Sequence, residues 1–448
     1  MPSSLWKAGV PSGSFTFTNC SRRGWHDLTP FLYRALISVL YPAFYPRLAR
    51  KYAEGLDERR ALYPEEKRRE LPENSLWIHA VSVGEVQSAW PLLEQIAEDG
   101  RVGKPLLSTT TATGRDMAFR LAGNLVSGHI FYPWDVPRIV RRALDAIRPK
   151  GYIVIETEIW PSMLFELKRR NIPAFLVNGR FSERTAANIR RRPSFWREVY
   201  DSFSLLLVRS GTDRSLLLET GLGEGKIRVT GDCKIDALLL RRKKADLSWA
   251  KKIAGGDGPV FLAGSTHQGE ETIALDAYRI VRSKLPSARL ILAPRHPERS
   301  GEAAALARGY APTVLLSEAE SGRAADWSVL VVDRIGVLFD LYGVADSAFI
   351  GGSIVDKGGQ NIMEPAAFGI PFSHGPYMRD FVDAAEGLGK KGAAVLVRDA
   401  GEIGAHWMRS LKEEEKQKAR TGAGEYFAAL GGAAAVSLDA IYGEMNLR

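Results

Sequence analysis

The chain has 448 residues, 45% of them hydrophobic and 25% charged, which is the balance of an ordinary globular protein. This composition argues against wholesale disorder, a collagen-like fibre and a polytopic membrane protein. At about 100–200 residues per domain, the length predicts two or three domains. Two cysteines without a CxxC pair disfavour disulfide frameworks and cysteine-rich zinc modules, so a reducing cytoplasm is the simplest setting.

The positive charge is concentrated in the first half of the chain. The formal net charge is +9 at pH 7, and residues 1–240 hold the whole excess, with 35 basic and 26 acidic side chains. Residues 101–200 alone carry 18 basic and 8 acidic groups. We expect the first domain to present a positive field that attracts an anionic substrate or membrane. A solvated surface that only aids solubility is the alternative.

The N-terminal residues predict two different segments. Residues 1–27 are rich in Ser, Gly and Thr and indicate a loose extension, whereas residues 28–56 form an apolar and basic arm. The apolar run from Pro30 to Pro46 is shorter than the ~20 residues that a spanning helix needs. Cationic residues follow it directly, which is typical of a segment that lies on an anionic membrane. The alternative is an arm that packs against its own chain.

Residues 57–240 alternate short apolar runs with helical patterns. Nearly continuous apolar strands need cover on both faces, so they predict a parallel sheet flanked by helices. The strand candidates are residues 76–82, 105–109, 151–156, 173–178, 204–208 and 227–230.

A basic and then glycine-rich stretch at 241–258 predicts a linker, and residues 259–448 predict a second α/β series that ends in helices. Its strand candidates are residues 260–264, 289–293, 329–333, 347–351 and 393–397. The expected fold class is therefore α/β, with two Rossmann-like domains facing an interdomain cleft and C-terminal helices. Ligands should bind at the carboxyl ends of the strands.

Glu85 is the first candidate for catalysis. The sequence SVGE at 82–85 follows a strand and opens a helix, which places Glu85 in the first helical turn. The helix macrodipole favours an ionised carboxylate there, and such a group suits a general base. The alternative is an ordinary acidic residue that stabilises the helix. No GxGxxG motif follows this strand, so a dinucleotide site is unsupported.

Two further charged motifs close strands of the first domain. The sequence ETE at 156–158 stands where a strand gives way to a helix, and Glu156 is better placed than Glu158 to face the cleft. Lys234 follows the last strand of this domain, where a cation can reach a phosphate or a carboxylate. Glu158 as a first-turn charge and Lys234 as a plain surface lysine are the alternatives.

The second half contains three strand-to-helix junctions, at residues 264–271, 293–299 and 351–371. The last is rich in glycine and predicts a short helix beginning at Asn361, with several free amide groups for a ligand. Asn361 and Glu364 also have the spacing of a capping box, which is their structural alternative. Metal binding is poorly supported, because no HxxxH or clustered Asp and His spacing occurs.

Taken together and in order, these motifs resemble those of the 3-deoxy-D-manno-oct-2-ulosonic acid (Kdo) transferases, which are GT-B glycosyltransferases. The agreement runs from about residue 30 to about residue 430. The matching segments are WIHAVSVGE (77–85), TTTATG (109–114), IETEIWPS (155–162), VNGRFSER (177–184), TGDCKID (230–236), AGSTHQGEE (263–271), LAPRHPER (292–299) and GGSIVDKGGQNIMEPAAFGIP (351–371).

The resemblance implies transfer of Kdo from CMP-Kdo to the lipid A precursor (lipid IVA), with inversion at the anomeric carbon. It implies a membrane surface as a further partner, no nucleic acid, no metal and no cofactor. The implied location is the cytoplasmic side of the inner membrane, with the enzyme peripheral or anchored by its N-terminal arm.

By motif, Glu85 matches the general base of the family, and Glu156 and Lys234 match residues that stabilise the transition state. Arg295 would contact the charged or cytosine portion of the donor, and Glu364 its ribose hydroxyls. The positions that match the CMP site are Pro294, Arg295, Ile335, Gly336, Val337, Asn361, Ile362, Met363 and Glu364.

The chain departs from the family pattern at two positions. Gln360 stands where the family usually has His, and Asp380 where it usually has Asn. Another GT-B transferase that acts on a lipid acceptor remains the alternative within enzymes. From a different class, a two-domain solute-binding protein would share two α/β lobes but needs no carboxylate poised as a base.

Overall fold

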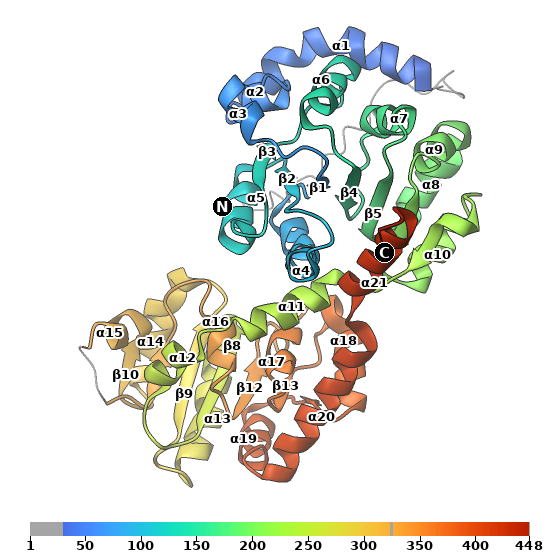
Figure 1. Cartoon of the computed structure of the whole chain (residues 1–448). Coiled ribbons are helices and arrows are strands. Elements are labelled where there is room, and N and C mark those ends of the chain that lie inside the picture. The colour runs from blue at the N-terminus through green and yellow to red at the C-terminus, as the bar shows by residue number, and fades with distance from the viewer. Residues whose placement is uncertain (1–29, 323–325, 448) are drawn as a thin grey trace, which may run out of the picture. The chain divides into compact units, whose positions relative to one another are not determined.

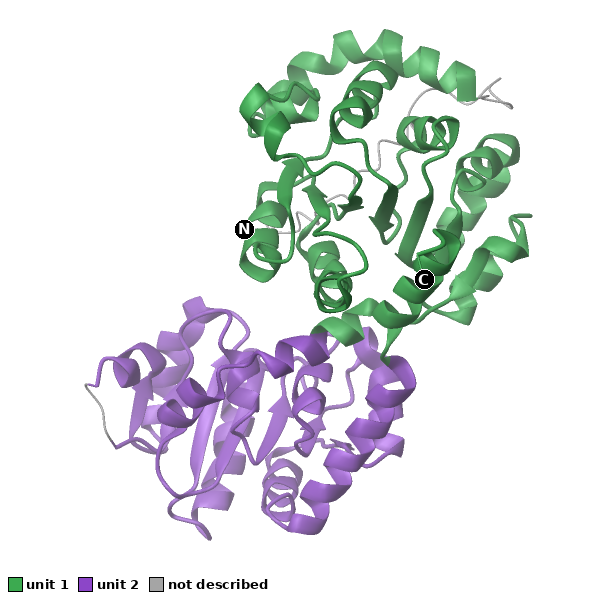
Figure 2. Ribbon diagram, viewed as in Figure 1, with its two compact units in different colours: residues 1–237, 431–448 green, residues 238–430 purple. Residues whose placement is uncertain are grey.

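A computed structural model describes residues 30–322 and 326–447 (Figure 1). The predicted extension at residues 1–27 lies outside this range. The chain divides into two units, residues 1–237 with 431–448 and residues 238–430, called unit 1 and unit 2 below (Figure 2).

Unit 1 is built on a seven-stranded sheet in which every pairing is parallel, in the order β3-β2-β1-β4-β5-β6-β7. Nearly every position of β1 to β6 is buried, as expected for a sheet covered on both faces. The strands are β1 Leu76–His79, β2 Leu106–Thr109, β3 Gly128–Phe131, β4 Gly151–Ile155, β5 Ala174–Gly179, β6 Leu205–Val208 and β7 Ile227–Val229. The parallel sheet predicted for this region is confirmed, although β3 was not among the predicted strands.

Helices flank this sheet (Figure 1). Helices α4 and α5 contact each other, α21 contacts α4, and α6 contacts α7. The large core cluster of unit 1 includes apolar side chains of the sheet and of α6 and α7. The helices are α2 Leu56–Arg59, α3 Glu65–Glu70, α4 Val83–Asp99, α5 Ala112–Ala122, α6 Pro137–Ile147, α7 Pro161–Arg169, α8 Glu183–Arg191, α9 Pro193–Tyr200, α10 Gly211–Leu218, the 3-10 turn η1 Glu224–Lys226 and α21 Ala433–Glu444.

The predicted arm contains helix α1, Pro30–Lys51, which contacts α6 and α7. On one side, the Tyr33 hydroxyl donates to Oδ2 of Asp135 at 3.0 Å, and the Tyr41 ring lies 5.7 Å from the Trp134 ring. Elsewhere on α1, Phe31 and Val39 are 77% and 75% exposed. The helix therefore packs on its own chain through one set of residues while another apolar set faces solvent.

Unit 2 has a second all-parallel sheet of seven strands, in the order β10-β11-β9-β8-β12-β13-β14. The strands are β8 Val260–Thr266, β9 Arg289–Pro294, β10 Thr313–Leu315, β11 Val329–Val331, β12 Ser347–Ile350, β13 Phe372–His374 and β14 Ala394–Leu396. The predicted second α/β series is confirmed, while the three-residue strands β10 and β13 were not predicted.

Helices of unit 2 pack on this sheet. The core cluster joins Phe261 and Leu290 of the sheet to side chains of α13, α14 and α19, while α16 contacts β8 from the side of Gly264. The helices are α12 Leu247–Ala254, α13 Glu270–Arg282, α14 Ser300–Arg308, α15 Leu316–Glu320, α16 Leu338–Tyr342, α17 Met363–Phe368, α18 Val382–Lys390, α19 Ala400–Arg409, α20 Glu413–Leu430 and the 3-10 turns η2 Pro297–Arg299 and η3 Arg379–Phe381.

The linker predicted at 241–258 is largely helical. Helix α11, Cys233–Lys243, crosses the boundary between the units, and α12 follows it after three residues. The Asp246 side chain caps α12 by accepting from the Trp249 amide at 2.9 Å, and α12 contacts α15 and α16. This segment is thus packed structure of unit 2 rather than a free connection.

The C-terminal boundary of the second predicted domain also differs from the structure. Residues 431–448 belong to unit 1 instead of extending unit 2 to residue 448. Helix α21 packs on α4 and β5, and the carboxylate of Asp236 accepts from the amides of Gly432 and Ala434, at 2.7 Å each, where this helix begins. Farther along α21, the Ser437 hydroxyl donates to Thr230 at 3.0 Å.

Among the described residues, one stretch, Glu413–Glu444, has the length and composition of a membrane span. It comprises α20 and α21, which are separated by Gly431 and Gly432. Helix α20 contacts α17 and α18 in unit 2, and α21 contacts α4 in unit 1. Core helices of soluble proteins have similar length and composition, so this stretch alone is weak evidence for a span.

Candidate active site

Glu85 lies at the start of α4, just after β1, and is 9% exposed. Its Oε2 accepts from the Val81 amide at 2.5 Å, and its Oε1 accepts from the Ser82 hydroxyl at 3.3 Å. Burial raises the pKa of Glu85 to about 8, and the charges of Glu158 and Glu156 raise it further. The expected ionisation by the helix macrodipole is therefore outweighed by desolvation, and the carboxyl binds a proton at neutral pH.

Glu156 is the residue that directly follows β4, and its backbone has a φ of 63°. A non-glycine residue in this region is uncommon and costs conformational energy. The Glu156 Oε1 lies 2.7 Å from Lys234 Nζ on α11 and accepts from the Ser88 hydroxyl at 3.4 Å. The structure therefore brings two of the three predicted catalytic residues into direct contact.

Ser88 lies three residues after Glu85 on the same helix, α4, and its hydroxyl is also 3.1 Å from the Gly84 carbonyl. Residues three apart on a helix lie on one face. Ser88 is not among the predicted site residues, although its spacing from Glu85 puts both side chains on the same face of a helix.

Glu158 is a third carboxylate of this cluster. Its pKa is raised by burial and by the charge of Glu156. Three acidic side chains, Glu85, Glu156 and Glu158, thus influence one another in unit 1 while Lys234 pairs with one of them. Such coupled carboxyl groups are typical of sites that hold and release protons.

The predicted CMP-binding residues all lie in unit 2. Pro294 ends β9, and the amide of the exposed Arg295 donates to the Thr266 carbonyl at 2.9 Å. In the turn before α16, Ile335 is 82% exposed and Gly336 has a φ of 98°. Both Arg295 and Ile335 are therefore available to a ligand.

The start of α17 differs from the prediction. The helix begins at Met363 rather than at Asn361, and Oδ1 of Asn361 accepts from the Met363 amide at 3.0 Å. Glu364 forms an ion pair with Arg241, at 3.3 Å, in place of the predicted capping-box bond. Burial raises the pKa of Glu364, and Arg241 partly offsets this rise.

The glycine-rich segment does not offer all its amides to a ligand, contrary to the expectation. Both carboxylate oxygens of the fully buried Glu270 accept backbone N–H groups from this segment. The donors are the amides of Gly352, Ser353, Ile354 and Val355, at 2.6 to 3.3 Å. Glu270, which is not among the predicted site residues, therefore fills the concave side of this turn.

Of the two departures from the family pattern, Gln360 lies in this glycine-rich segment and Asp380 contacts it from the turn η3. Gln360 Nε2 lies 3.3 Å from Nε2 of His267. The amide of Asp380 donates to the Gly358 carbonyl at 2.9 Å, and a Cβ on Gly358 would lie 2.7 Å from the Asp380 carboxylate. Asp380 therefore supports the loop from below, whereas Gln360 lies beside a ring that can contact a ligand.

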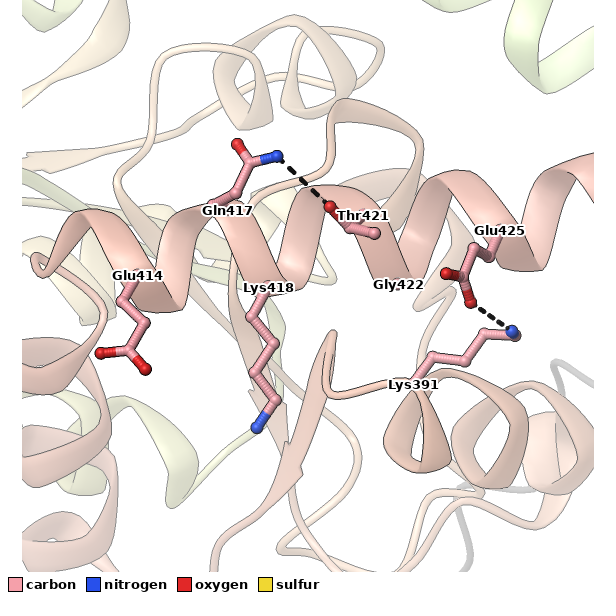
Figure 3. Close-up of a pocket in the computed structure, with 7 residues that line it drawn as sticks. All are labelled: Lys391, Glu414, Gln417, Lys418, Thr421, Gly422 and Glu425. Atoms are coloured by element: carbon pink, nitrogen blue, oxygen red, sulfur yellow. Dashed lines mark hydrogen bonds and ion pairs between the residues drawn. The ribbon is translucent and has the colours of Figure 1, made fainter.

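Across residues 30–322 and 326–447, no group of three or more His, Cys, Asp or Glu side chains is arranged to hold a metal ion. A hollow of about 470 Å³ lies on unit 2 and is lined by Lys391, Glu414, Gln417, Lys418, Thr421, Gly422 and Glu425 (Figure 3). Two pairs of its polar groups bond to each other, Lys391 with Glu425 at 2.8 Å and Gln417 with Thr421 at 3.3 Å. None of the candidate site residues lines it.

Two units, each with an all-parallel seven-stranded sheet flanked by helices, give the chain a two-domain α/β fold of the GT-B type. The chain has this fold in common with UDP-GlcNAc 2-epimerase from Neisseria meningitidis, with a TM-score of 0.55 and 15% identity. The match covers 82% of this chain and all of the epimerase chain. At this identity, the similarity shows the fold alone.

Sequence comparison identifies the family. Residues 54–237 match the family described as 3-Deoxy-D-manno-octulosonic-acid transferase (kdotransferase). The 3-deoxy-D-manno-octulosonic acid transferase of Bordetella pertussis is 33% identical over 376 residues, 82% of this chain and 86% of that protein. The one from Haemophilus influenzae is 29% identical over 391 residues, 87% and 89% of the two chains. The chain belongs to the Kdo transferase family and is a glycosyltransferase, which confirms the resemblance seen in its motifs.

Proposed function

We propose that this protein transfers Kdo from CMP-Kdo to a hydroxyl of the lipid A precursor, with inversion at the anomeric carbon. The observation that carries the proposal is the cluster of Glu85, Ser88, Glu156 and Lys234 in a chain of this family. A buried carboxyl beside a paired lysine supplies both a proton acceptor and a positive charge. The transfer of a sugar to a hydroxyl needs both.

Glu85 is proposed as the general base. Its carboxylate takes the proton of the acceptor hydroxyl while the acceptor oxygen bonds to the anomeric carbon and the bond from that carbon to the CMP phosphate breaks. A base whose pKa lies near the working pH transfers protons efficiently, and the pKa of about 8 meets this condition. The bonds from Val81 and Ser82 hold the carboxylate in a fixed orientation.

Lys234 and Glu156 are proposed to stabilise the transition state. Lys234 offers a positive charge to the negative charge that develops as CMP leaves, and its pairing with Glu156 restricts where the ammonium group can lie. The uncommon backbone of Glu156 supports this role, because such strain concentrates at functional sites.

Unit 2 is proposed to bind the donor. Arg295 would contact the charged or cytosine portion, and Glu364 would accept hydrogen bonds from ribose hydroxyls while Arg241 neutralises part of its charge. The remaining residues proposed to contact CMP are Pro294, Ile335, Gly336, Val337, Asn361, Ile362 and Met363. Glu270 occupies the amides at 352–355 and Asn361 accepts from the Met363 amide, so side chains rather than these amides are proposed to hold the donor.

We also propose that the enzyme works on the cytoplasmic side of the inner membrane. The excess of basic side chains at residues 101–200 suits an acceptor that carries phosphates. The exposed apolar side chains of α1 and the cations that end this helix, Arg50 and Lys51, suit a lipid surface.

Incubation with CMP-Kdo and the lipid A precursor tests the proposal directly, with the product mass read by mass spectrometry. The expected product is the precursor heavier by one or more Kdo residues. CMP should also raise the melting temperature, while UDP should not, because a ligand stabilises only a protein whose native state binds it. Stabilisation by UDP, together with no Kdo transfer, would instead support a different GT-B transferase.

A further inference from the structure

Glu270 ties together two loops that follow neighbouring strands of unit 2. Its Oε2 accepts from the His267 amide at 2.9 Å, in the loop after β8, and from the Gly352 amide at 2.6 Å, in the loop after β12. The loop after β12 then closes on itself, because the Gly359 amide donates to the Gly352 carbonyl at 2.8 Å. These bonds place Gln360 beside His267.

Gln360 and His267 contact each other closely, and they leave no space for a side chain at Gly352. Their Nε2 atoms are 3.3 Å apart, so the amide donates to an unprotonated ring nitrogen. A Cβ on Gly352 would lie 3.2 to 3.3 Å from both side chains, and its φ of 66° favours glycine. One N–H of the Gln360 amide is used by His267, and the other is left for a ligand oxygen.

Positive groups surround this pair. The permanent cations that act on His267 are Lys357 and Arg295, against one carboxylate, Glu270. The rings of His267 and His296 lie 5.7 Å apart, and Arg295 and Lys357 are exposed. Glu270 already accepts five backbone N–H groups, so its charge is largely compensated locally. The region therefore favours an anion.

We propose that His267, Lys357 and Gln360 form the subsite for the carboxylate of the donor sugar. This inference rests on the proposed function, since Kdo is an acid whose carboxylate is attached to its anomeric carbon. A carboxylate binds N–H donors and cations, and the Gln360 amide and the Lys357 ammonium group supply one of each. With the amides at 352–355 bound to Glu270, side chains rather than backbone amides recognise the acid group here.

The test compares CMP-Kdo with CMP, which lacks the sugar and its carboxylate. Lys357→Ala and Gln360→Ala should each raise the KM for CMP-Kdo by about tenfold or more, as expected for a lost bond to a charged group. Gln360→Glu should raise it further, because two carboxylates then face each other. The Kd for CMP, from titration calorimetry, should stay within about twofold of the wild-type value.

Lys390→Ala is the matched control, because Lys390 is an exposed lysine of unit 2 that pairs with Glu386. This variant should change neither the KM for CMP-Kdo nor the Kd for CMP. An unchanged KM for CMP-Kdo in the subsite variants would overturn the inference. A rise in the Kd for CMP as large as the rise in KM would also overturn it, because these residues would then bind the phosphate that both ligands carry. Failure of the proposed function looks different, because the wild-type enzyme would then transfer no Kdo at all.

Discussion

Lys234 Nζ lies 2.7 Å from Oε1 of Glu156, and this ion pair joins the helix after β7 to the residue that follows β4. The lysine side chain is 45% exposed and that of Glu156 is 19% exposed. A pair this open to water adds little to the free energy of unfolding. Glu156 nevertheless keeps a backbone with a φ of 63° at this position, which supports the chemical role proposed for it.

Replacement of Lys234 by Met should therefore separate catalysis from stability. We expect kcat for Kdo transfer to fall by about 10²-fold, because a preorganised charge is lost. The free energy of unfolding in urea should change by less than about 1 kcal/mol. Lys234→Arg should recover part of the rate. Lys243→Met, which removes an exposed lysine at the end of the same helix, should have no effect. If Lys234→Met transfers Kdo with the wild-type kcat, Lys234 has no role in catalysis and is an ordinary surface lysine.

Replacement of Glu85 by Gln should abolish transfer while CMP binding survives. The amide has the size of the carboxyl group but cannot take a proton, and loss of a general base costs about 10²–10⁴-fold in rate. Single-turnover assays with CMP-Kdo and calorimetry with CMP measure the two effects. Near-normal turnover would remove Glu85 from the mechanism.

The stability of this variant distinguishes a base from a helix-stabilising residue. The pKa of Glu85 is about 8 in the folded protein against 4.5 in model peptides, so the folded state binds the proton more tightly. The wild type therefore loses stability as the pH rises from about 4.5 to about 8. At pH 8.5, Glu85→Gln should be more stable by about 1 kcal/mol or more, and near pH 4.5 the two should be alike. A less stable variant at both pH values would support the helix-stabilising role.

The pH dependence of transfer should move when Glu158 is replaced by Gln. Transfer needs ionised Glu85, so kcat/KM should rise toward pH 8, and the charge of Glu158 contributes to the high pKa of Glu85. Without that charge, the pH range over which kcat/KM rises should move to lower pH by roughly half a pH unit. Glu98→Gln, at an exposed position of α4, is the control and should leave the profile in place. If the pH profile of kcat/KM is the same in Glu158→Gln as in the wild type, Glu158 does not influence the ionisation that limits transfer.

Residue pattern alone predicted that each of the three catalytic candidates follows a strand of a parallel sheet. Glu85, Glu156 and Lys234 each follow a strand, β1, β4 or β7, and parallel strands bring their carboxyl ends to one edge. Buried strands such as β4 were visible as apolar runs. The unpredicted strands β3 (GHIF), β10 (TVL) and β13 (FSH) each have only one or two strongly apolar residues in a row, so they lack such a run.

Other features depend on contacts between distant parts of the chain. Glu270 resembles any acidic residue of a first helical turn, yet it binds amides more than 80 residues away. The high pKa of Glu85 comes from burial, which residue spacing does not report. The pairing of Asp236 with the start of α21 crosses almost 200 residues, and for this reason the C-terminal helix was assigned to the wrong unit.

Asp236 should prove necessary for the C-terminal helix to dock on unit 1. Its carboxylate satisfies two amides at the start of α21, and loss of such a cap typically costs about 1–2 kcal/mol. Asp236→Ala should lower the free energy of unfolding by this amount and speed proteolytic cleavage near Gly431. Asp439→Ala, on the exposed side of α21, is the control. Equal stability of both variants would argue against the cap.

The last prediction concerns helix α1 and the membrane. Deletion of residues 1–46 would remove exposed apolar groups, but it would also strip Tyr33 and Tyr41 from the surface of unit 1. Substitution of the outward residues alone is a cleaner test. The double variant Phe31→Ser and Val39→Ser changes two side chains that are 77% and 75% exposed.

We expect this double variant to bind vesicles of anionic phospholipid about tenfold more weakly in sedimentation assays, because inserted apolar area drives interfacial binding. The binding that remains should fade with added salt, since Arg47, Arg50 and Lys51 supply an attraction that ions screen. CMP binding and the melting temperature should be unchanged, because the contacts of Tyr33 and Tyr41 are kept. Ile280→Ser, which alters an apolar side chain of unit 2 that is 39% exposed, should bind vesicles like the wild type. If the double variant also binds like the wild type at high salt, α1 is a packing helix and another apolar surface holds the enzyme to lipid.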